Sequence, residues 1–199
     1  PEQIIKLFPK NFYENTYGTV TVVNEQAEPE NLRQIQITPF RQEAKYSDKR
    51  HPDSVTFTKN LNSDLERRDF TINTIAYDPI KDKIIDQHKG QKDIKDKIIR
   101  AVGQPESRFA EDPLRIMRGV RLASDLNFTI NLETIEGMVK TSKMLEFIAQ
   151  ERIRDEFCKI LMTKNLMPGI IILQKIGALK QFLPELEEGI GMKQNGDHK

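Results

Sequence analysis

The sequence predicts an α+β protein, in which a segment of mixed helices and strands precedes a segment of helices only. Three observations predict this fold class. Runs rich in Val, Ile and Thr, or alternating between apolar and polar residues, gather in the first half of the chain. From about residue 106 onward, apolar residues recur with helical periodicity and strand signals nearly vanish. Apolar residues make up 37% and charged residues 31% of the chain, which fits a packed core without gross disorder.

The first predicted elements are one short helix and two strands. Residues 1–8 predict a helix, and the Thr- and Val-rich residues 17–23 predict a strand. The polar residues 24–32 predict a turn or loop. Residues 35–41 alternate as a half-buried strand does, and Pro39 predicts that this strand lies at a sheet edge or a bulge.

A polar segment and a second group of elements follow. Residues 42–53 predict a mobile loop, and residues 55–58 a short strand. Residues 69–77 predict a helix, which ends there because the residue before Pro79 avoids helical backbone angles. Residues 92–98 alternate in the sign of their charges, which predicts a short solvated helix.

Helical periodicity defines the second half of the chain. We therefore predict a boundary near Arg100, and Cys158 is expected to be an inert core residue of one helix. The predicted helices are residues 113–126, 134–139, 142–147, 150–161 and 167–176.

Composition limits the class of protein. The net charge of +1 argues against a polybasic tail that grips nucleic acid along its length, although local basic patches remain possible. A single cysteine excludes an internal disulfide and predicts a reducing compartment. No signal peptide or long apolar span is recognisable, so we expect a cytoplasmic protein with no membrane partner.

The run Glu111-Asp112-Pro113-Leu114-Arg115 is the most informative motif. Asp112 and Arg115 are three residues apart at a helix start, so they project from one face. Together they present an acceptor and a fork of donors, which copies the edge of a nucleobase. The alternative is a surface helix with Asp112 as its N-cap, Pro113 at its first position and solvated arginines.

Such a pair would select among bases. Adenine and cytosine each place an amino donor beside a ring-nitrogen acceptor, whereas guanine and uracil present the reverse order. Each buried polar group left unpaired costs about 1–3 kcal/mol, so one rigid pair would accept ATP and CTP and reject GTP and UTP.

Arg115, Arg118 and Arg121 continue the row at steps of three residues. Three positive charges along one helical ridge repel one another unless an anion lies nearby. A triphosphate or a tRNA phosphate is an anion of this kind.

The run from Arg67 to Asn73 is a second candidate site. Asp69 and Asn73 lie one helical turn apart and are predicted to hold ribose hydroxyls, while Arg68 is predicted to reach phosphate oxygens. The alternative is again an N-cap with solvated arginines. The three histidines, at positions 51, 88 and 198, have no ligand spacing, so no metal site and no catalytic residue are predicted in the chain.

In this order, the runs resemble the CCA-adding tRNA nucleotidyltransferases of the bacterial and eukaryotic class, a family shared with bacterial poly(A) polymerases. The matching runs are Tyr17 to Val20, Gln42 to Val55, Arg67 to Ala76, Asp86 to Val102, Arg108 to Arg115 and Glu151 to Leu161. The resemblance implies a partial nucleotidyltransferase head, an antiparallel sheet with helices, over residues 1–100. It further implies an all-helical neck that recognises the base over residues 101–162 and the start of a helical body over 163–199.

The resemblance implies transfer of CMP and AMP from CTP and ATP to the 3′ end of tRNA. Arg68 would touch the triphosphate, Asp69 with Asn73 the ribose, and Asp112 with Arg115 the base. The two further arginines of the row, Arg118 and Arg121, would complete the nucleotide or primer site. Two Mg²⁺ ions would activate the hydroxyl and stabilise the leaving pyrophosphate.

One departure from the family limits this expectation. The strand with two metal-binding aspartates is expected upstream of Pro1, and Gln36 occupies the place of a further acidic residue. An amide is a poor Mg²⁺ ligand beside carboxylates, so we expect the chain to be a fragment that is inactive alone. Alternatives are a poly(A) polymerase, a CC- or A-adding enzyme, a non-catalytic nucleotide- or RNA-binding module, and a purely structural helical scaffold.

Overall fold

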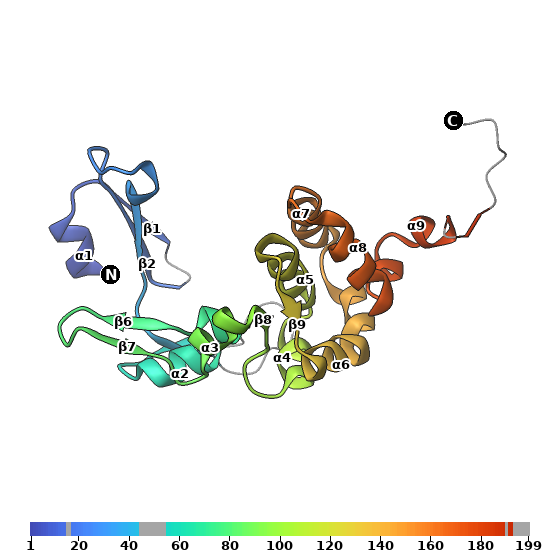
Figure 1. The fold of residues 1–199 in the computed structure, drawn as a ribbon. Helices are drawn as coiled ribbons and strands as arrows, with labels where there is room; N and C mark the ends of the chain where they lie inside the picture. Colours follow the sequence, from blue (N-terminus) through green and yellow to red (C-terminus); the bar gives the residue numbers. More distant parts are fainter. Residues whose placement is uncertain (15–16, 44–54, 190, 193–199) are drawn as a thin grey trace. The chain divides into compact units, whose positions relative to one another are not determined.

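The computed structural model describes residues 1–14, 17–43, 55–189 and 191–192 (Figure 1). The chain forms two compact units. The described residues of the first unit are 1–43 and 55–64, and those of the second begin at Leu65. The mixture of helices and small sheets confirms the predicted α+β class. Within the described ranges, no helix combines the length and apolar character needed to cross a membrane.

The described part of the first unit contains antiparallel strands, helix α1 and the start of helix α2 (Leu61–Glu66). A three-stranded sheet has the order β1-β2-β3, with Val20 and Val22 of the central strand buried. A separate pair joins β4 to β5. The elements are α1 Glu2–Leu7, β1 Asn11–Glu14, β2 Thr19–Val23, a 3-10 turn Glu30–Leu32, β3 Gln34–Ile37, β4 Arg41–Glu43 and β5 Val55–Phe57.

Pro39 interrupts the strand that was predicted over residues 35–41. The chain forms β3 before it and β4 after it, because proline has no N–H to donate to a ladder. Strand β3 ends the described sheet, as predicted for a strand beside a proline. The predicted loop 42–53 is wrong at its start, where residues 42 and 43 belong to β4, and residues 44–53 lie outside the described residues.

The second unit begins with short elements that pack beside a helical group. Helix α2 joins the two units in sequence, and β8 pairs in parallel with β9. Strands β6 and β7 form an antiparallel hairpin. The bounds are α2 Leu61–Glu66, a 3-10 turn Thr71–Asn73, β6 Ala76–Asp78, β7 Lys83–Ile85, α3 Gly90–Asp96, β8 Ile98–Ile99 and β9 Thr129–Ile130.

The predicted helix over residues 69–77 is wrong. Only one 3-10 turn forms before the chain enters β6. Backbone groups here bond to a distant segment instead of to the preceding turn: Thr71 N–H donates to Arg100 O at 2.9 Å, and Val102 N–H to Asp69 O at 3.0 Å. The four β-branched residues in positions 71–75 also favour extended backbone over helix.

The predicted helices of the second half are present, with ends that differ by at most two residues from the prediction. The exception is the helix predicted over 142–147, which is a 3-10 helix. The bounds are α4 Pro105–Glu111, α5 Leu114–Leu126, α6 Leu132–Thr141, α7 Gln150–Leu161, α8 Leu166–Lys175, a 3-10 turn Leu179–Gln181 and α9 Pro184–Glu188.

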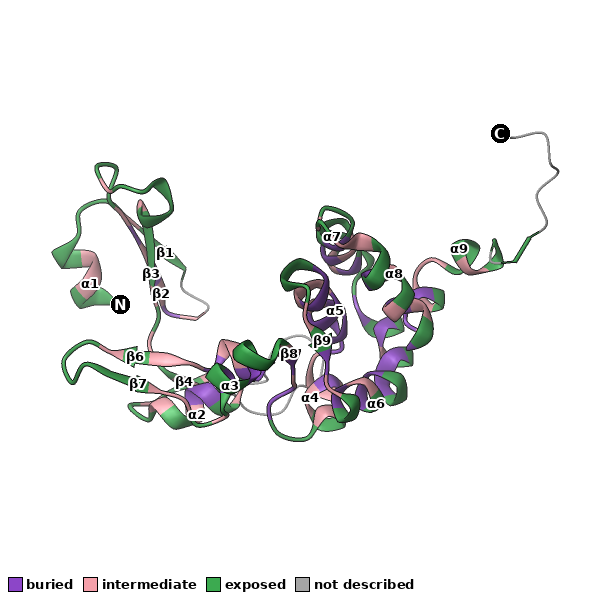
Figure 2. Ribbon diagram, viewed as in Figure 1, coloured by how far each residue is buried: buried purple, intermediate pink, exposed green. Residues whose placement is uncertain are grey.

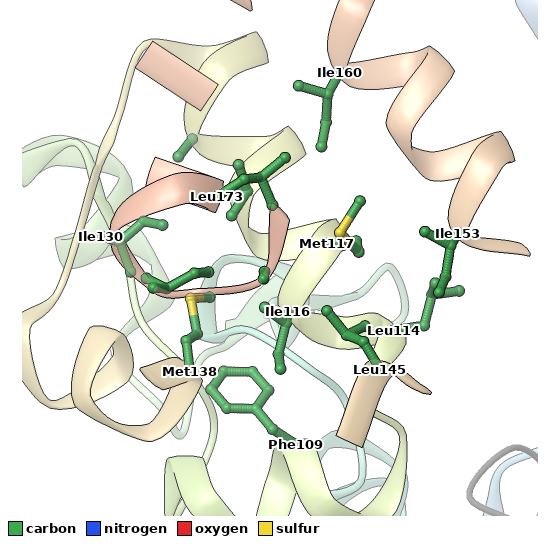
Figure 3. Close-up of a cluster of buried hydrophobic side chains, with 14 of the residues drawn as sticks. Phe109, Leu114, Ile116, Met117, Ile130, Met138, Leu145, Ile153, Ile160 and Leu173 are labelled. Carbon is green, nitrogen blue, oxygen red and sulfur yellow. The ribbon is translucent and has the colours of Figure 1, made fainter. Parts of the chain in front are cut away.

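Helix α5 is the centre of the core of this unit. Figure 2 shows that most of its length is buried, and Figure 3 shows the apolar side chains gathered around it. Ile116, Met117 and Val120 of α5 are fully buried, and helices α7 and α8 pack along α5. The prediction of a buried Cys158 is wrong, since this thiol is exposed. The inward face of α7 is taken by Ile153, Phe157 and Ile160 at helical spacing.

Candidate functional site

Two glycines let the segment 69–73 lie directly on the helices. A Cβ atom at Gly119 of α5 would come within 2.7 Å of Phe70 Cζ and 2.6 Å of Met138 Cε. A Cβ atom at Gly90 would come within 2.3 Å of the carbonyl oxygen of Thr71. Only glycine permits such close approach at both positions. The aromatic ring of Phe70 therefore packs over α5, and this contact places Asp69 beside the arginine row.

Asp69 connects the 3-10 turn to α5. The residue is only 6% exposed, and its Oδ1 accepts hydrogen bonds from Phe70 N at 2.9 Å and Asn73 Nδ2 at 3.0 Å. Its Oδ2 lies 2.6 Å from Arg118 Nη2. The predicted proximity of Asp69 and Asn73 is thus present, although a 3-10 turn rather than an α-helix creates it.

Arg68 bends back over the same turn. Its Nη1 donates to the carbonyl oxygen of Asn73 at 3.0 Å. The guanidinium therefore lies next to the residues that Asp69 organises. Arg68, Asp69, Asn73 and Arg118 form one group, which we call the Asp69 cluster. Its predicted contacts with phosphate and ribose stay predictions.

Asp112 lies at the junction between α4 and α5. Helix α5 has Pro113 as its N-cap, so the predicted N-cap position of Asp112 is wrong by one residue. Its carboxylate still supports the helix start, because Oδ1 accepts from Leu114 N at 3.2 Å. The other oxygen, Oδ2, faces Arg152 Nη2 of α7 at 3.5 Å.

Arg115 turns toward α4 and is 8% exposed. Its Nη1 donates to Glu111 Oε2 at 2.7 Å and to Arg108 O at 3.1 Å, and its Nη2 donates to Arg67 O at 3.4 Å. Asp112 and Arg115 therefore lie close in sequence but have different partners in this arrangement. The base-reading role of Asp112 and Arg115 stays a prediction.

Each arginine of the row has a carboxylate partner inside the protein. Arg115 pairs with Glu111, Arg118 with Asp69, and Arg121 Nε with Glu156 Oε2 at 2.8 Å. The expected repulsion along the ridge is thus relieved without an external anion. Sequence spacing shows only the first of these pairs, because Glu111 and Arg115 are four residues apart on one stretch of chain.

Glu156 ties α7 to α5. It accepts from Arg121 and from Lys159 Nζ, each at 2.8 Å, and the residue is buried. Burial raises the pKa of the Glu156 carboxyl, but the hydrogen bonds from Lys159 and Arg121 outweigh it and leave the pKa below its ordinary value. The carboxylate is therefore ionised at neutral pH and holds both cations.

A cavity of about 340 Å³ lies between α5 and α7, near the C-terminal ends of both helices. Arg121 is the one candidate residue that lines it, so the cavity does not unite the predicted site. Its lining residues are Arg121, Asp125, Cys158, Lys159, Met162 and Thr163.

Among the residues that the structure describes, no three Asp, Glu, His or Cys side chains lie close enough together to bind a metal ion. The resemblance implies Mg²⁺ ligands upstream of Pro1, and that expectation stays a prediction. Gln36 lies exposed on β3, opposite Thr21 of β2.

Sequence reasoning missed three partners of the site. Glu111 could have been found from its spacing to Arg115. Glu156 and Arg152 could not, because they come from α7 and reach α5 only through the packing of the two helices. Both belong to the run from Glu151 to Leu161, for which we predicted no contact with the candidate residues.

Comparison with protein families identifies the class of protein. Residues 1–100 match the family described as "Poly A polymerase head domain", and residues 127–190 match "Probable RNA and SrmB- binding site of polymerase A". The chain belongs to this family of poly(A) polymerase-type nucleotidyltransferases, which confirms the predicted resemblance.

Curated relatives narrow the comparison to one kind of enzyme. The chain is 47% identical over 171 residues to the "CCA-adding enzyme" of Ligilactobacillus salivarius, covering 85% of this chain and 41% of that protein. It is 42% identical over 189 residues to the "CCA-adding enzyme" of Lactococcus lactis, covering 94% of this chain and 46% of that protein. The chain thus spans less than half the length of these relatives.

Solved structures have the same fold. The Bacillus stearothermophilus CCA-adding enzyme in complex with CTP superposes with a TM-score of 0.77 and 36% identity, covering 89% of this chain and 41% of that one. A CCA-adding enzyme in its apo form II gives a TM-score of 0.78 at 27% identity, covering 92% and 43%.

Proposed function

We propose that this chain is the nucleotide-selecting part of an RNA nucleotidyltransferase that adds C and A residues to the 3′ end of tRNA from CTP and ATP. The observation that carries the proposal is the similarity of nearly the whole chain to proteins named CCA-adding enzymes, one of them solved with CTP. All seven candidate residues belong to the second unit, on the segment 68–73, at the junction before α5 and along α5 itself.

The roles of the residues follow from their chemistry. Asp69 and Asn73 supply acceptors and an amide for ribose hydroxyls, and Arg68 supplies donors for phosphate oxygens. Asp112 and Arg115 supply the acceptor and donor for the base. The two further arginines of the row, Arg118 and Arg121, complete the nucleotide or primer site. Because the described residues do not gather Mg²⁺ ligands, no step assigned to them involves the ion.

A domain order accompanies this proposal. Residues 1–100 serve as the head, 101–162 as the neck that recognises the base, and 163–199 as the start of the body. A cytoplasmic location is proposed from the single cysteine alone.

Nucleotide binding tests the proposal on the chain itself. Calorimetric titration with each of the four nucleoside triphosphates should show binding of ATP and CTP and much weaker binding of GTP and UTP. Equal affinity for all four nucleotides would contradict the proposed base selection. No binding of any nucleotide would favour the alternative of a purely structural helical scaffold.

Measuring which nucleotides are incorporated into tRNA distinguishes CCA addition from poly(A) polymerase activity and from binding without catalysis. The gene product that contains this chain should extend a tRNA lacking its terminal CCA with C and A only. Incorporation of A alone would favour the poly(A) polymerase, and selective binding without incorporation would favour the non-catalytic module.

A further inference from the structure

The salt bridge between Asp112 and Arg152 joins the base-reading carboxylate to a helix outside the predicted motif. Arg152 lies in the first turn of α7, which packs along α5 in Figure 1. The side chains are only 16% exposed for Asp112 and 25% exposed for Arg152. Screening by water is weak at such burial, so the attraction across 3.5 Å is stronger than that of a surface pair.

The two oxygens of Asp112 are held from different sides. The Leu114 N–H restrains Oδ1 and the Arg152 guanidinium faces Oδ2. A carboxylate that reads an amino group must present its acceptor at a fixed angle, because a mismatched base is rejected only if the carboxylate cannot turn away. Arg152 is the one charged partner that the described structure gives to Asp112.

Arg152 also carries an unsatisfied donor. Its Nη1 is buried without a hydrogen-bond partner among the described residues. An unsatisfied buried donor costs about 1–3 kcal/mol, and groups of this kind in folded proteins call for a functional explanation. A residue that served only to clamp α7 to the helix junction would gain from a fully paired or apolar side chain at this position.

We propose that Arg152 is a positioning residue for base selection, which fixes the Asp112 carboxylate so that it accepts the amino group of adenine or cytosine. The inference rests on the proposed function and adds a specificity-determining residue from α7. Arg152 acts through Asp112, so its loss lowers selectivity between bases more than affinity for the triphosphate.

The test measures selectivity in Arg152→Met, which keeps the apolar stem of the side chain and removes its charge. The ratio of the dissociation constants of GTP and ATP, and of UTP and CTP, should fall by about tenfold, as expected for one loosened base contact. Arg154→Met is the matched control, because Arg154 lies on the same helix, is 67% exposed and pairs only with its neighbour Asp155 in the described structure. Its ratios should equal those of the wild type.

Testing Arg152→Met in the Asp112→Ala variant shows whether Arg152 acts through Asp112 or affects nucleotide binding in some other way. Adding Arg152→Met to Asp112→Ala should change the ratios no further, because the carboxylate that Arg152 positions is already absent. An equal fall in both backgrounds would overturn the inference. Arg152→Lys keeps the charge and should recover part of the selectivity, and thermal melting of every variant identifies those that fail to fold.

Failure of the inference and failure of the proposed function give different results. If the wild type binds ATP and CTP selectively and both Arg152 variants retain its ratios, Arg152 has no positioning role and the proposed function stands. If the folded wild type shows no selectivity, the proposed function fails and this inference fails with it.

Discussion

Gly119→Ala is expected to weaken the attachment of the segment 69–73 to α5. The added Cβ would lie 2.6 Å from Met138 Cε and 2.7 Å from Phe70 Cζ. An ordinary carbon contact is about 3.5–4.0 Å, so both neighbours must give way by roughly 1 Å. Neither has free space to move into, because Phe70 and Met138 are both fully buried.

Two opposing effects determine how much Gly119→Ala changes the free energy of unfolding. Overpacking of a core costs about 1–3 kcal/mol, whereas alanine in place of glycine within a helix gains about 1 kcal/mol. We therefore expect a net loss of about 1 kcal/mol in the free energy of unfolding. For a chain of this length, such a loss lowers the melting temperature by about 2–4 °C. Displacement of Phe70 should also shift Asp69, its neighbour in sequence, and reduce affinity for ATP.

Circular dichroism melting and calorimetric titration with ATP measure the two effects. Gly189→Ala is the matched control, since the nearest atom to its added Cβ would be Leu186 O at 3.6 Å, and neither quantity should change. Phe70→Leu combined with Gly119→Ala should cost less than the sum of the single changes, because the smaller side chain leaves room for the methyl group. A more stable Gly119→Ala protein with unchanged ATP affinity would refute this account of the packing.

The remaining predictions concern stability. Because the folded-state pKa of Glu156 lies below its ordinary value of 4.5, its stabilisation is present above that pH and is lost as the pH falls through the folded pKa. Glu156→Gln should therefore reduce the urea midpoint near neutral pH, by leaving Arg121 unpaired, and reduce it much less in strong acid; equal losses at both would contradict the assignment. Ile160→Ala, at a fully buried position, should cost about 2–5 kcal/mol in urea unfolding, and a cost near zero would show that the core is misplaced. Thr71→Val removes the hydroxyl donor to Asp93 Oδ2 at 2.7 Å and should cost about 1–3 kcal/mol, measured by hydrogen exchange of the 3-10 turn; unchanged protection would contradict it.

The helical half of the fold could be predicted from the sequence because local periodicity determines it. Helix α7 occupies the predicted residues 150–161, and α5 differs from its prediction by one residue at its start. The backbone of residues 69–71 could not be predicted, since its partners lie about thirty positions away, on the segment that ends at Val102. Ala76 and Tyr77 pair instead with β7, in a hairpin that the sequence analysis did not predict. Pro39 predicted a sheet edge or a bulge, and β3 does lie at the edge of the described sheet. The sequence did not show that this strand ends at Ile37 or that a second strand, β4, follows.

Candidate site residues could be proposed from chemistry and spacing, whereas their partners could not. The hydrogen bond from Asn73 to Asp69 agrees with the predicted proximity, although the local backbone differs. The partner of Arg118 is Asp69, which comes from another element, and no pattern along the chain shows that contact. For the same reason, the exposure of Cys158 depends on which face of α7 meets α5, and its apolar neighbours in sequence were misleading.

The pairing of Arg118 with Asp69 has a consequence for ligand choice. A tethered carboxylate competes with any incoming anion at an effective concentration of roughly millimolar or more. On the proposed function, a nucleotide whose ribose hydroxyls contact Asp69 while its phosphates contact Arg118 offers a new partner to both residues of the pair, whereas inorganic phosphate offers one to Arg118 alone. We therefore expect this pair to favour nucleotides over inorganic phosphate.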